Sequence, residues 1–381
     1  MKLVLVHDWI IDLGGAEQCL RVFHNTWPEA PVYTLISNPE SAVKMGFNID
    51  QIHSSFLQRM PRAAKWHRHF LPLYPLAIEQ FDLSPYDLIL SSSHAAAKGV
   101  LAGSGQLHIC YCHTPIRYAW DLYNQYLQEH HLQRGLKSAL VRLVLHYIRM
   151  WDVAASSRVD HFIANSSYTA RRIWRAYRRE AEIIFPPVDV DRFAPTKNKD
   201  DFFIFVSRLV PYKRADLVVA AFTNLDLPLL VVGDGPQLER CRSLAGRNIS
   251  FMGYQSDAKL AELMARARAL VFAAEEDFGI VPVEAQACGT PVIAYGKGGV
   301  EDTVVPADGS NWKQATGVFF YEQTAEAIVA AVNQFIYWEK HFDMSVLRQH
   351  AELFKTEEFE KQICSFISAK WEQRQRIERG L

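Results

Sequence analysis

The chain has 381 residues, of which 49% are hydrophobic and 22% charged, and its formal net charge at pH 7 is −1. This length and composition favour two domains of ordinary size, each able to bury its own apolar core. The near-zero net charge gives no indication of a polyanionic partner, and the sequence contains no recognisable nucleic-acid-binding module and no apolar run near the roughly 20 residues of a membrane span.

The first half of the chain alternates short apolar runs with helical patterns. We predict buried strands at residues 2–6, 31–36, 87–93, 108–114 and 161–167. A long helical pattern at 134–157 separates the last two of these strands. Because strands that alternate with helices form parallel sheets with crossover helices, residues 1–188 are predicted to form one Rossmann-like domain.

A second series of strands and helices follows a polar, proline-marked segment at 189–199, which we interpret as a linker. The second domain is predicted to span residues 200–355. Residues 356–381 carry apolar side chains at helical intervals, and this helix either pads the second domain or packs back on the first. The predicted fold class is α/β, with two doubly wound domains facing a central cleft. The strands predicted for the second domain lie at residues 202–208, 227–235, 249–253, 269–274 and 291–296.

Six cysteines are scattered along the chain without the paired C-x-x-C spacing of a zinc site. We expect them to be reduced core thiols. Met1-Lys2 runs directly into an apolar strand, which leaves no room for a targeting segment. Together these features predict a cytoplasmic protein. The cysteines are Cys19, Cys110, Cys112, Cys241, Cys288 and Cys364.

Ligands of parallel α/β folds bind at the carboxyl ends of the strands. In the first domain, Gly14 and Gly15 open a helix there, where bare N–H groups and the helix dipole favour an anion. A tight turn with positive φ explains the same two glycines equally well.

In the second domain, Arg208 and Lys213 flank a proline turn after a buried strand. Two cations that converge at this position suit a diphosphate leaving group, although solvated surface cations give the same pattern. The next strand ends in Gly233-Asp234-Gly235-Pro236. The proline argues against a dinucleotide loop, so we do not expect NAD. Close packing beside a bound base and ordinary turn chemistry both remain open.

A further strand is followed by Glu276, Gly279 and Glu284. We predict that Gly279 breaks the backbone and that Glu284 lies near the N-terminus of the next helix, where a carboxylate can bind sugar hydroxyls. The alternatives are that Glu284 only complements the helix dipole and that Glu276 belongs to an exposed acidic loop.

The second-domain pattern resembles the signature of the family-4 retaining glycosyltransferases of the GT-B fold. The resemblance rests on Glu276-x7-Glu284 with Phe278-Gly279, on FVSRLVPYKR and on VVGDGP. The N-terminal GGAE and the strings SSYTARRI and VDVDRF agree as well, so it covers nearly the whole chain.

The resemblance implies a role for each matching position. Glu276 would bind the donor sugar and stabilise an oxocarbenium-like transition state, and Glu284 would hold the ribose hydroxyls. Arg208 and Lys213 would bind the diphosphate, with the Gly15 N–H on the first-domain side. His113 matches the family's histidine near the donor sugar, ahead of His7 and His94. The remaining residues of the expected nucleotide-sugar site are Gly14, Gly233, Phe278, Gly279, Ile280 and Val281.

We expect no metal and no other cofactor. Asp189-Val190-Asp191 spells the D-x-D metal motif of the other glycosyltransferase fold, but it lies in the predicted linker rather than after a first-domain strand. The two cations at Arg208 and Lys213 would supply the positive charge that the diphosphate needs.

The acceptor is expected on the first domain. Two basic stretches occur there, one around Trp66 and one at 134–179, and they favour docking on an anionic membrane surface over ordinary solvated helix faces. We therefore predict a glycan or polyprenyl-linked acceptor in surface polysaccharide synthesis. The run CHTPIRYAWDLYNQYL resembles members that use GDP-mannose. A UDP-glucose or UDP-GlcNAc transferase, a nucleotide-sugar epimerase and a non-catalytic sugar-nucleotide sensor remain as alternatives.

Overall fold

The computed structural model describes residues 1–129 and 131–378 and divides into two compact units. One unit joins Met1–Pro187 to the C-terminal segment from Phe359, and the other spans Val188–Glu358. The segment 189–199, predicted as a linker, groups with the second unit. The reason is direct bonding, because Arg348 donates to the carbonyl oxygens of Val190 and Phe193 at 2.7 and 2.6 Å.

The first unit is built on a parallel sheet of order β3-β2-β1-β4-β5-β6-β7. All five predicted strands are present. The three-residue strands β3 and β7 were missed because each is short and only partly buried, so neither forms an apolar run. The strands are β1 (Leu3–Ile10), β2 (Val32–Ser37), β3 (Ile52–Ser54), β4 (Leu88–Ser93), β5 (Leu107–Cys112), β6 (His161–Ala164) and β7 (Ala181–Ile183).

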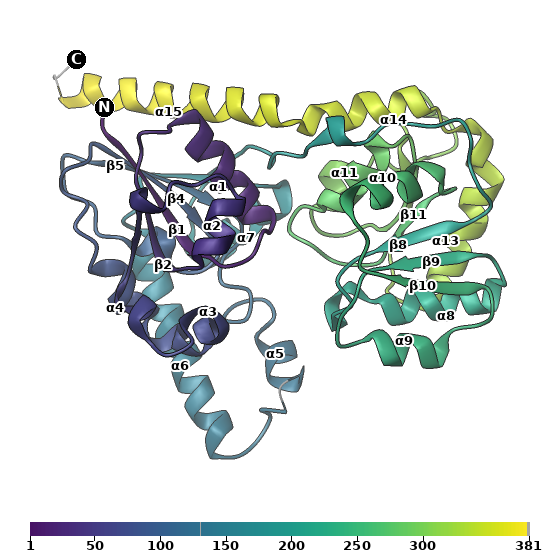
Figure 1. The fold of residues 1–381 in the computed structure, drawn as a ribbon, viewed down its shortest axis with the longest axis horizontal. Coiled ribbons are helices and arrows are strands. Elements are labelled where there is room, and N and C mark those ends of the chain that lie inside the picture. Colours follow the sequence, from purple (N-terminus) through teal and green to yellow (C-terminus); the bar gives the residue numbers. More distant parts are fainter. Residues whose placement is uncertain (130, 379–381) are drawn as a thin grey trace. The chain divides into compact units, whose positions relative to one another are not determined.

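Helices cover this sheet, and the last helix of the chain is one of them (Figure 1). Phe359, Ile363 and Ile367 of α15 are buried in the same core as Phe23 of α1. The apolar spacing of the C-terminal segment therefore packs it on the first unit. The helices are α1 (Gly15–Thr26), α2 (Pro39–Lys44), α3 (Ala63–Trp66), α4 (Tyr74–Glu79), α5 (Tyr123–Glu129), α6 (Leu136–Ser156), α7 (Ser167–Tyr177) and α15 (Thr356–Glu378).

The predicted helix at 134–157 is α6, and a buried ion pair anchors it. Lys98 Nζ lies 2.5 Å from Asp152 Oδ1, and both side chains are fully buried. The same carboxylate accepts from Trp120 Nε1 and the Tyr177 hydroxyl, each at 2.8 Å. These bonds compensate part of the cost of burying two charges and tie α6 to the loop after β4.

The second unit has a parallel sheet of order β10-β9-β8-β11-β12-β13. Its five predicted strands are present, and β13 was missed because it has four residues, begins with glycine and follows a polar loop. The strands are β8 (Phe203–Val206), β9 (Leu229–Val232), β10 (Ile249–Gly253), β11 (Leu270–Phe272), β12 (Val292–Tyr295) and β13 (Gly317–Phe320). The helices are α8 (Ala215–Leu225), α9 (Leu238–Leu244), α10 (Asp257–Arg266), α11 (Ile280–Ala287), α12 (Val300–Thr303), α13 (Ala325–Trp338) and α14 (Met344–Ala351).

In both sheets the strand order reverses beside the strand that starts the series, between β1 and β4 and between β8 and β11. At such a switch point the helices on either side leave in opposite directions, and a crevice opens at the carboxyl ends of the strands. Each unit therefore has one place where its topology favours ligand binding. All six cysteines are free, and five of them are buried.

Candidate functional site

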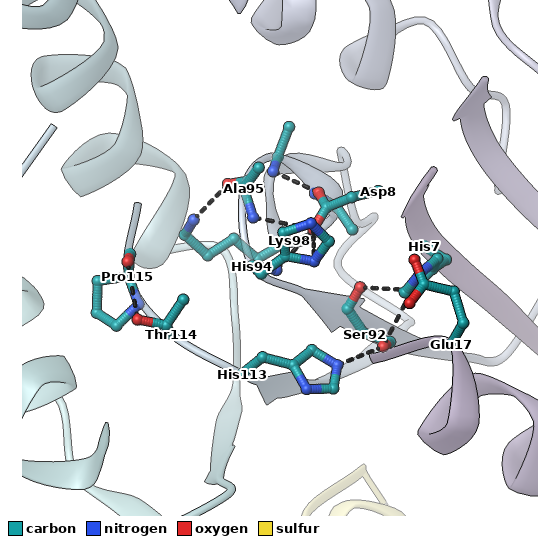
Figure 2. Close-up of polar contacts among 12 residues, drawn as sticks. His7, Asp8, Glu17, Ser92, His94, Ala95, Lys98, His113, Thr114 and Pro115 are labelled. Atoms are coloured by element: carbon teal, nitrogen blue, oxygen red, sulfur yellow. Dashed lines mark hydrogen bonds and ion pairs between the residues drawn. The ribbon is translucent and has the colours of Figure 1, made fainter. Parts of the chain in front are cut away.

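Polar side chains gather at the β1–β4 switch point of the first unit (Figure 2). His7 and Asp8 come from β1, which continues to Ile10 rather than ending before them. Ser92 is the next-to-last residue of β4, and His113 follows β5. Because β1, β4 and β5 are neighbours in the sheet, their ends bring these residues together.

The Ser92 hydroxyl links two of the histidines. It lies 2.8 Å from His113 Nε2 and 3.1 Å from His7 Nδ1. His94 stands beside both rings, with ring centroids 6.1 Å from His7 and 6.3 Å from His113. Burial, reinforced by His94 and His7, holds the pKa of His113 well below its usual value. A neutral imidazole at neutral pH can donate or accept a hydrogen bond to a sugar hydroxyl.

Asp8 organises the loop that carries His94. Its carboxylate is fully buried and accepts four backbone N–H groups, from His94 and Ala95 on Oδ2 and from Ala96 and Ala97 on Oδ1, at 2.5–2.9 Å. Burial by itself raises the pKa of a carboxyl, but His94, His7 and the backbone donors outweigh it, and the pKa of Asp8 is lowered. The predicted list of site residues missed Asp8, although its position at the end of an apolar run was a visible signal.

The two N-terminal glycines open α1 as predicted, but the positive-φ explanation for them is wrong. Gly14 is the N-cap with φ −112°, and Gly15 starts the helix without positive φ. The Gly14 N–H donates to Glu17 Oε2 at 3.1 Å, and a Cβ on Gly14 would stand only 2.8 Å from that oxygen. A Cβ at Gly14 would therefore require the Glu17 carboxylate to shift.

In the second unit, Lys213 and Glu276 meet at the β8–β11 switch point. Lys213 ends the short turn after β8, and Glu276 lies in the loop after β11. Their side chains form an ion pair, and both are mostly buried. The pairing of β8 with β11 brings together two residues that are 63 positions apart in the sequence.

Arg208 follows the same strand and is exposed. The turn after β9 packs against this strand end, because a Cβ on Gly233 would overlap the Ser207 carbonyl and one on Gly235 would stand 2.5 Å from the Leu209 carbonyl oxygen. Both glycines have positive φ as well. The Gly-Asp-Gly turn thus permits close backbone packing beside Arg208, in addition to supplying turn geometry.

The loop that carries Glu276 is held by glycines that the prediction left out. Gly279 has φ 94° and forms the left-handed N-cap of α11, in agreement with the predicted break. Gly298 and Gly299 pack directly under residues 276–278, where added side chains would meet backbone atoms. The Gly299 N–H donates to the Glu276 carbonyl at 2.8 Å. In the sequence, the signal for this contact was the run Gly-Lys-Gly-Gly at residues 296–299.

Glu284 lies farther along α11 than predicted. It is the fifth residue of the helix, outside the first turn, so complementing the helix dipole does not explain it. Its Oε1 is 3.2 Å from Arg192, which also bonds Asp257 at 2.8 Å. Arg192 was missed as a partner, although it lies in the VDVDRF string. Burial raises the pKa of Glu284 to about 7, and Arg192 opposes this shift only in part.

We expect Glu284→Gln to change how stability depends on pH. The folded pKa of about 7 exceeds the reference value of 4.5, so the native state binds an extra proton between these values. That contribution to stability is complete below about pH 4.5 and is lost as pH rises through about 7. Relative to wild type, Glu284→Gln should therefore gain up to about 3 kcal/mol as pH rises across this window. Urea titrations at several pH values measure it, with Glu322→Gln as an exposed control, and an unchanged difference would contradict the buried titration.

The Asp189-Val190-Asp191 motif lies in the second unit, with Asp191 3.0 Å from Arg348. Within the described residues, we find no group of three or more His, Cys, Asp or Glu side chains arranged to hold a metal ion. Among the described helices, none is both long and apolar enough to cross a membrane. The expectation of a metal-independent reaction stays a prediction.

Two sequence-family models match the chain. The model described as Glycosyltransferase Family 4 matches residues 13–192, and the one described as Glycosyl transferases group 1 matches residues 188–344. The chain belongs to glycosyltransferase family 4. The second match includes the whole β8–β11 switch point. The first match includes Ser92, His94 and His113 and begins after His7 and Asp8 of β1.

Curated relatives match this family-4 chain over part of its length. A GDP-mannose-dependent mannosyltransferase of Corynebacterium glutamicum, which acts on a monoacylated phosphatidylinositol monomannoside, is 34% identical over 40% of this chain and 49% of its own. The D-inositol 3-phosphate glycosyltransferase of Mycobacterium leprae is 31% identical over 37% of this chain and 39% of its own. The matched segments thus span at most about half of these relatives.

Solved structures resemble the family-4 chain over nearly its whole length. Sucrose-phosphate synthase from Thermosynechococcus elongatus aligns over 98% of this chain and 100% of its own, with TM-score 0.72 and 19% identity. The Anabaena protein HepE, solved in complex with UDP, aligns over 97% and 100%, with TM-score 0.68 and 18% identity. At this identity the likeness shows the fold alone, which is of the GT-B type.

Proposed function

We propose that this chain is a retaining hexosyltransferase that moves mannose from GDP-mannose to a glycan or lipid-linked glycan acceptor in surface polysaccharide synthesis. The observation that carries the proposal is the Lys213–Glu276 pair at the β8–β11 switch point of a family-4 chain. There a cation and a carboxylate stand side by side, with Arg208 on the same strand end. A sugar diphosphate presents the complementary groups, since its phosphates bind cations and its hydroxyls donate hydrogen bonds to a carboxylate.

The proposed reaction is a front-face displacement at the anomeric carbon. The bond from that carbon to the donor phosphate oxygen breaks, and a bond to the acceptor oxygen forms on the same face. The departing phosphate oxygen takes the acceptor's proton, so no protein base is required. Arg208 and Lys213 stabilise the negative charge that develops on the diphosphate, and Glu276 stabilises the positive charge on the sugar ring. On the first unit, neutral His113 holds a hydroxyl of the donor sugar.

Two comparisons favour mannose as the donor sugar. The curated relative from Corynebacterium glutamicum, with 34% identity, is named as GDP-mannose-dependent, and CHTPIRYAWDLYNQYL resembles members with that donor. The alternative is a UDP-glucose or UDP-GlcNAc transferase. In its favour, the solved Anabaena protein of the same fold binds UDP and UDP-glucose.

Calorimetric titration with GDP, UDP, GDP-mannose, UDP-glucose, UDP-GlcNAc and NAD tests the donor. We expect GDP and GDP-mannose to bind with the same affinity in the presence and absence of EDTA. Both should bind about 10- to 100-fold more weakly to Arg208→Ala, because the variant loses charged hydrogen bonds to phosphate. Arg242→Ala is the matched control, since Arg242 is a half-exposed arginine paired with Glu239 on α9.

The outcomes of this titration separate the candidates. Preference for UDP would keep the transferase and replace the sugar, and loss of binding in EDTA would contradict the metal-free reaction. Nucleotide-sugar binding without turnover, over a broad acceptor screen, would favour a sensor. Release of an epimerised sugar without any acceptor would favour an epimerase. Absence of nucleotide binding would contradict the catalytic proposal.

The proposed acceptor places the enzyme in the cytoplasm, at the inner face of the cytoplasmic membrane. A polyprenyl-linked glycan is held at that surface, so the acceptor-binding unit has to work beside anionic headgroups. The first unit carries the two basic stretches of the chain, and these support the placement.

A further inference from the structure

The outward face of α6 carries a continuous stripe of exposed apolar side chains. Leu136 is 92% exposed, Leu140 62% and Leu143 64%, and Tyr147 and Met150 continue the stripe toward the C-terminus. Their spacing of four, three, four and three residues places them on one side of a helix. Isolated exposed apolar residues are common on protein surfaces, but such a row along one helix marks an interaction surface.

The opposite face of α6 holds the helix on its unit. Leu145 and Ile148 are buried with Ile116 and Ala119, and Trp151 and Ala155 are buried in a second core cluster. The buried Lys98–Asp152 pair fixes the C-terminal half. The exposed stripe is therefore presented by a firmly packed helix, and the stripe is not part of the core of its own unit.

The exposed charges of α6 and of the residue pair before it have a single sign. Arg134 precedes the helix, and Lys137 and Arg142 are exposed along its first half. Asp152 is the sole acidic residue of α6, and it is fully buried against Lys98. An exposed helix face with cations and apolar groups but no carboxylate is complementary to a surface that is negatively charged outside and apolar beneath.

We propose that α6 is a docking helix that lies flat on an anionic lipid bilayer, with Leu136, Leu140 and Leu143 buried among the acyl chains and the cations at the phosphate level. A second copy of the chain is the competing occupant, because the same spacing suits a paired helix. Pairing two such faces would place cations against cations with no exposed acid on α6 to balance them. The proposal rests on the proposed function only for its purpose, which is to hold the first unit beside a lipid-linked acceptor.

Vesicle flotation with the full chain tests the docking surface. We expect binding to vesicles of phosphatidylcholine mixed with phosphatidylglycerol, little binding to pure phosphatidylcholine, and release by high salt, which screens the charges. Leu140→Gln with Leu143→Gln should weaken binding at least about tenfold, because two apolar side chains no longer leave water. Arg134→Gln and Lys137→Gln should each weaken it about fivefold.

Matched controls lie on the second unit. Leu353 is 59% exposed, so Leu353→Gln removes a similar side chain from another surface, and Lys313→Gln removes an exposed cation. Both should bind vesicles as the wild type does. Circular dichroism and thermal melting of each α6 variant check that the helix remains folded.

Three results would overturn the proposal. These are equal binding to neutral and anionic vesicles, full vesicle binding by the α6 variants, and a dimer in light scattering that the leucine substitutions dissociate. Calorimetry with GDP on the same variants separates this test from the proposed function. If the α6 variants keep their affinity for GDP but no longer bind vesicles, docking by α6 is supported. If the wild type does not bind GDP, the proposed enzyme is contradicted, and the vesicle result still decides the docking surface.

Discussion

Replacing Lys213 by methionine is expected to lower turnover of the sugar-nucleotide donor by about 10²- to 10³-fold. Lys213 is held at the β8–β11 switch point by its ion pair with Glu276, in a mostly buried position. A preorganised ammonium there stabilises the charge of the departing diphosphate without reorganisation, and methionine fills similar volume without that charge. Release of GDP from GDP-mannose measures the effect, and slow donor hydrolysis serves as the reaction while the acceptor is being identified.

Glu276→Gln is expected to lower turnover as well, and the double variant should lose less than the product of the two single effects, since side chains in contact do not act independently. Lys259→Met is the matched control, because Lys259 forms a lysine–glutamate pair with Glu262 on the exposed face of α10. If Lys213→Met binds the donor and turns it over at the wild-type rate, Lys213 does not contribute to the reaction.

Asp8→Asn is expected to lower the free energy of unfolding by about 3–5 kcal/mol. Each carboxylate oxygen of Asp8 accepts two backbone N–H groups from residues 94–97. An asparagine keeps one oxygen but turns an NH₂ group toward two of those donors. Two buried N–H groups would then lose their acceptor and face another donor. Urea unfolding measures the loss.

Asp82→Asn is the control for that experiment. Asp82 also accepts from a backbone N–H, that of Ser84 at 3.0 Å, but it is exposed, so water replaces the lost bond and little change is expected. If Asp8→Asn is as stable as wild type, the 94–97 loop does not depend on this carboxylate. The His94 ring should also shift in the variant, because Asp8 Oδ2 lies 3.1 Å from its Nδ1.

The sequence alone determined the fold class and the elements that carry the site. The five strands predicted in each half are all present, because strands inside a parallel sheet are apolar along most of their length and leave a recognisable run. The edge strands β3 and β7 left no such run, since each has three residues with partial burial. Strand β13 was missed because it has four residues and begins with glycine after a polar loop. The helical spacing of 356–381 was visible too, but the sequence left open which domain it covers.

Tertiary structure decided which side chains meet. Lys213 and Glu276 were separate candidates in the sequence, and the β8–β11 pairing makes them an ion pair. His7, Ser92 and His113 are joined in the same way by the order β1-β4-β5, and Glu284 finds Arg192 rather than a helix terminus. The physical reason is that neighbouring residues in the sequence determine apolar periodicity and turn chemistry. The partners of a polar side chain depend instead on the strand order, which no local sequence pattern encodes. The sequence therefore determined the strand ends at which chemistry can occur, and the sheet topology decided the contacts made there.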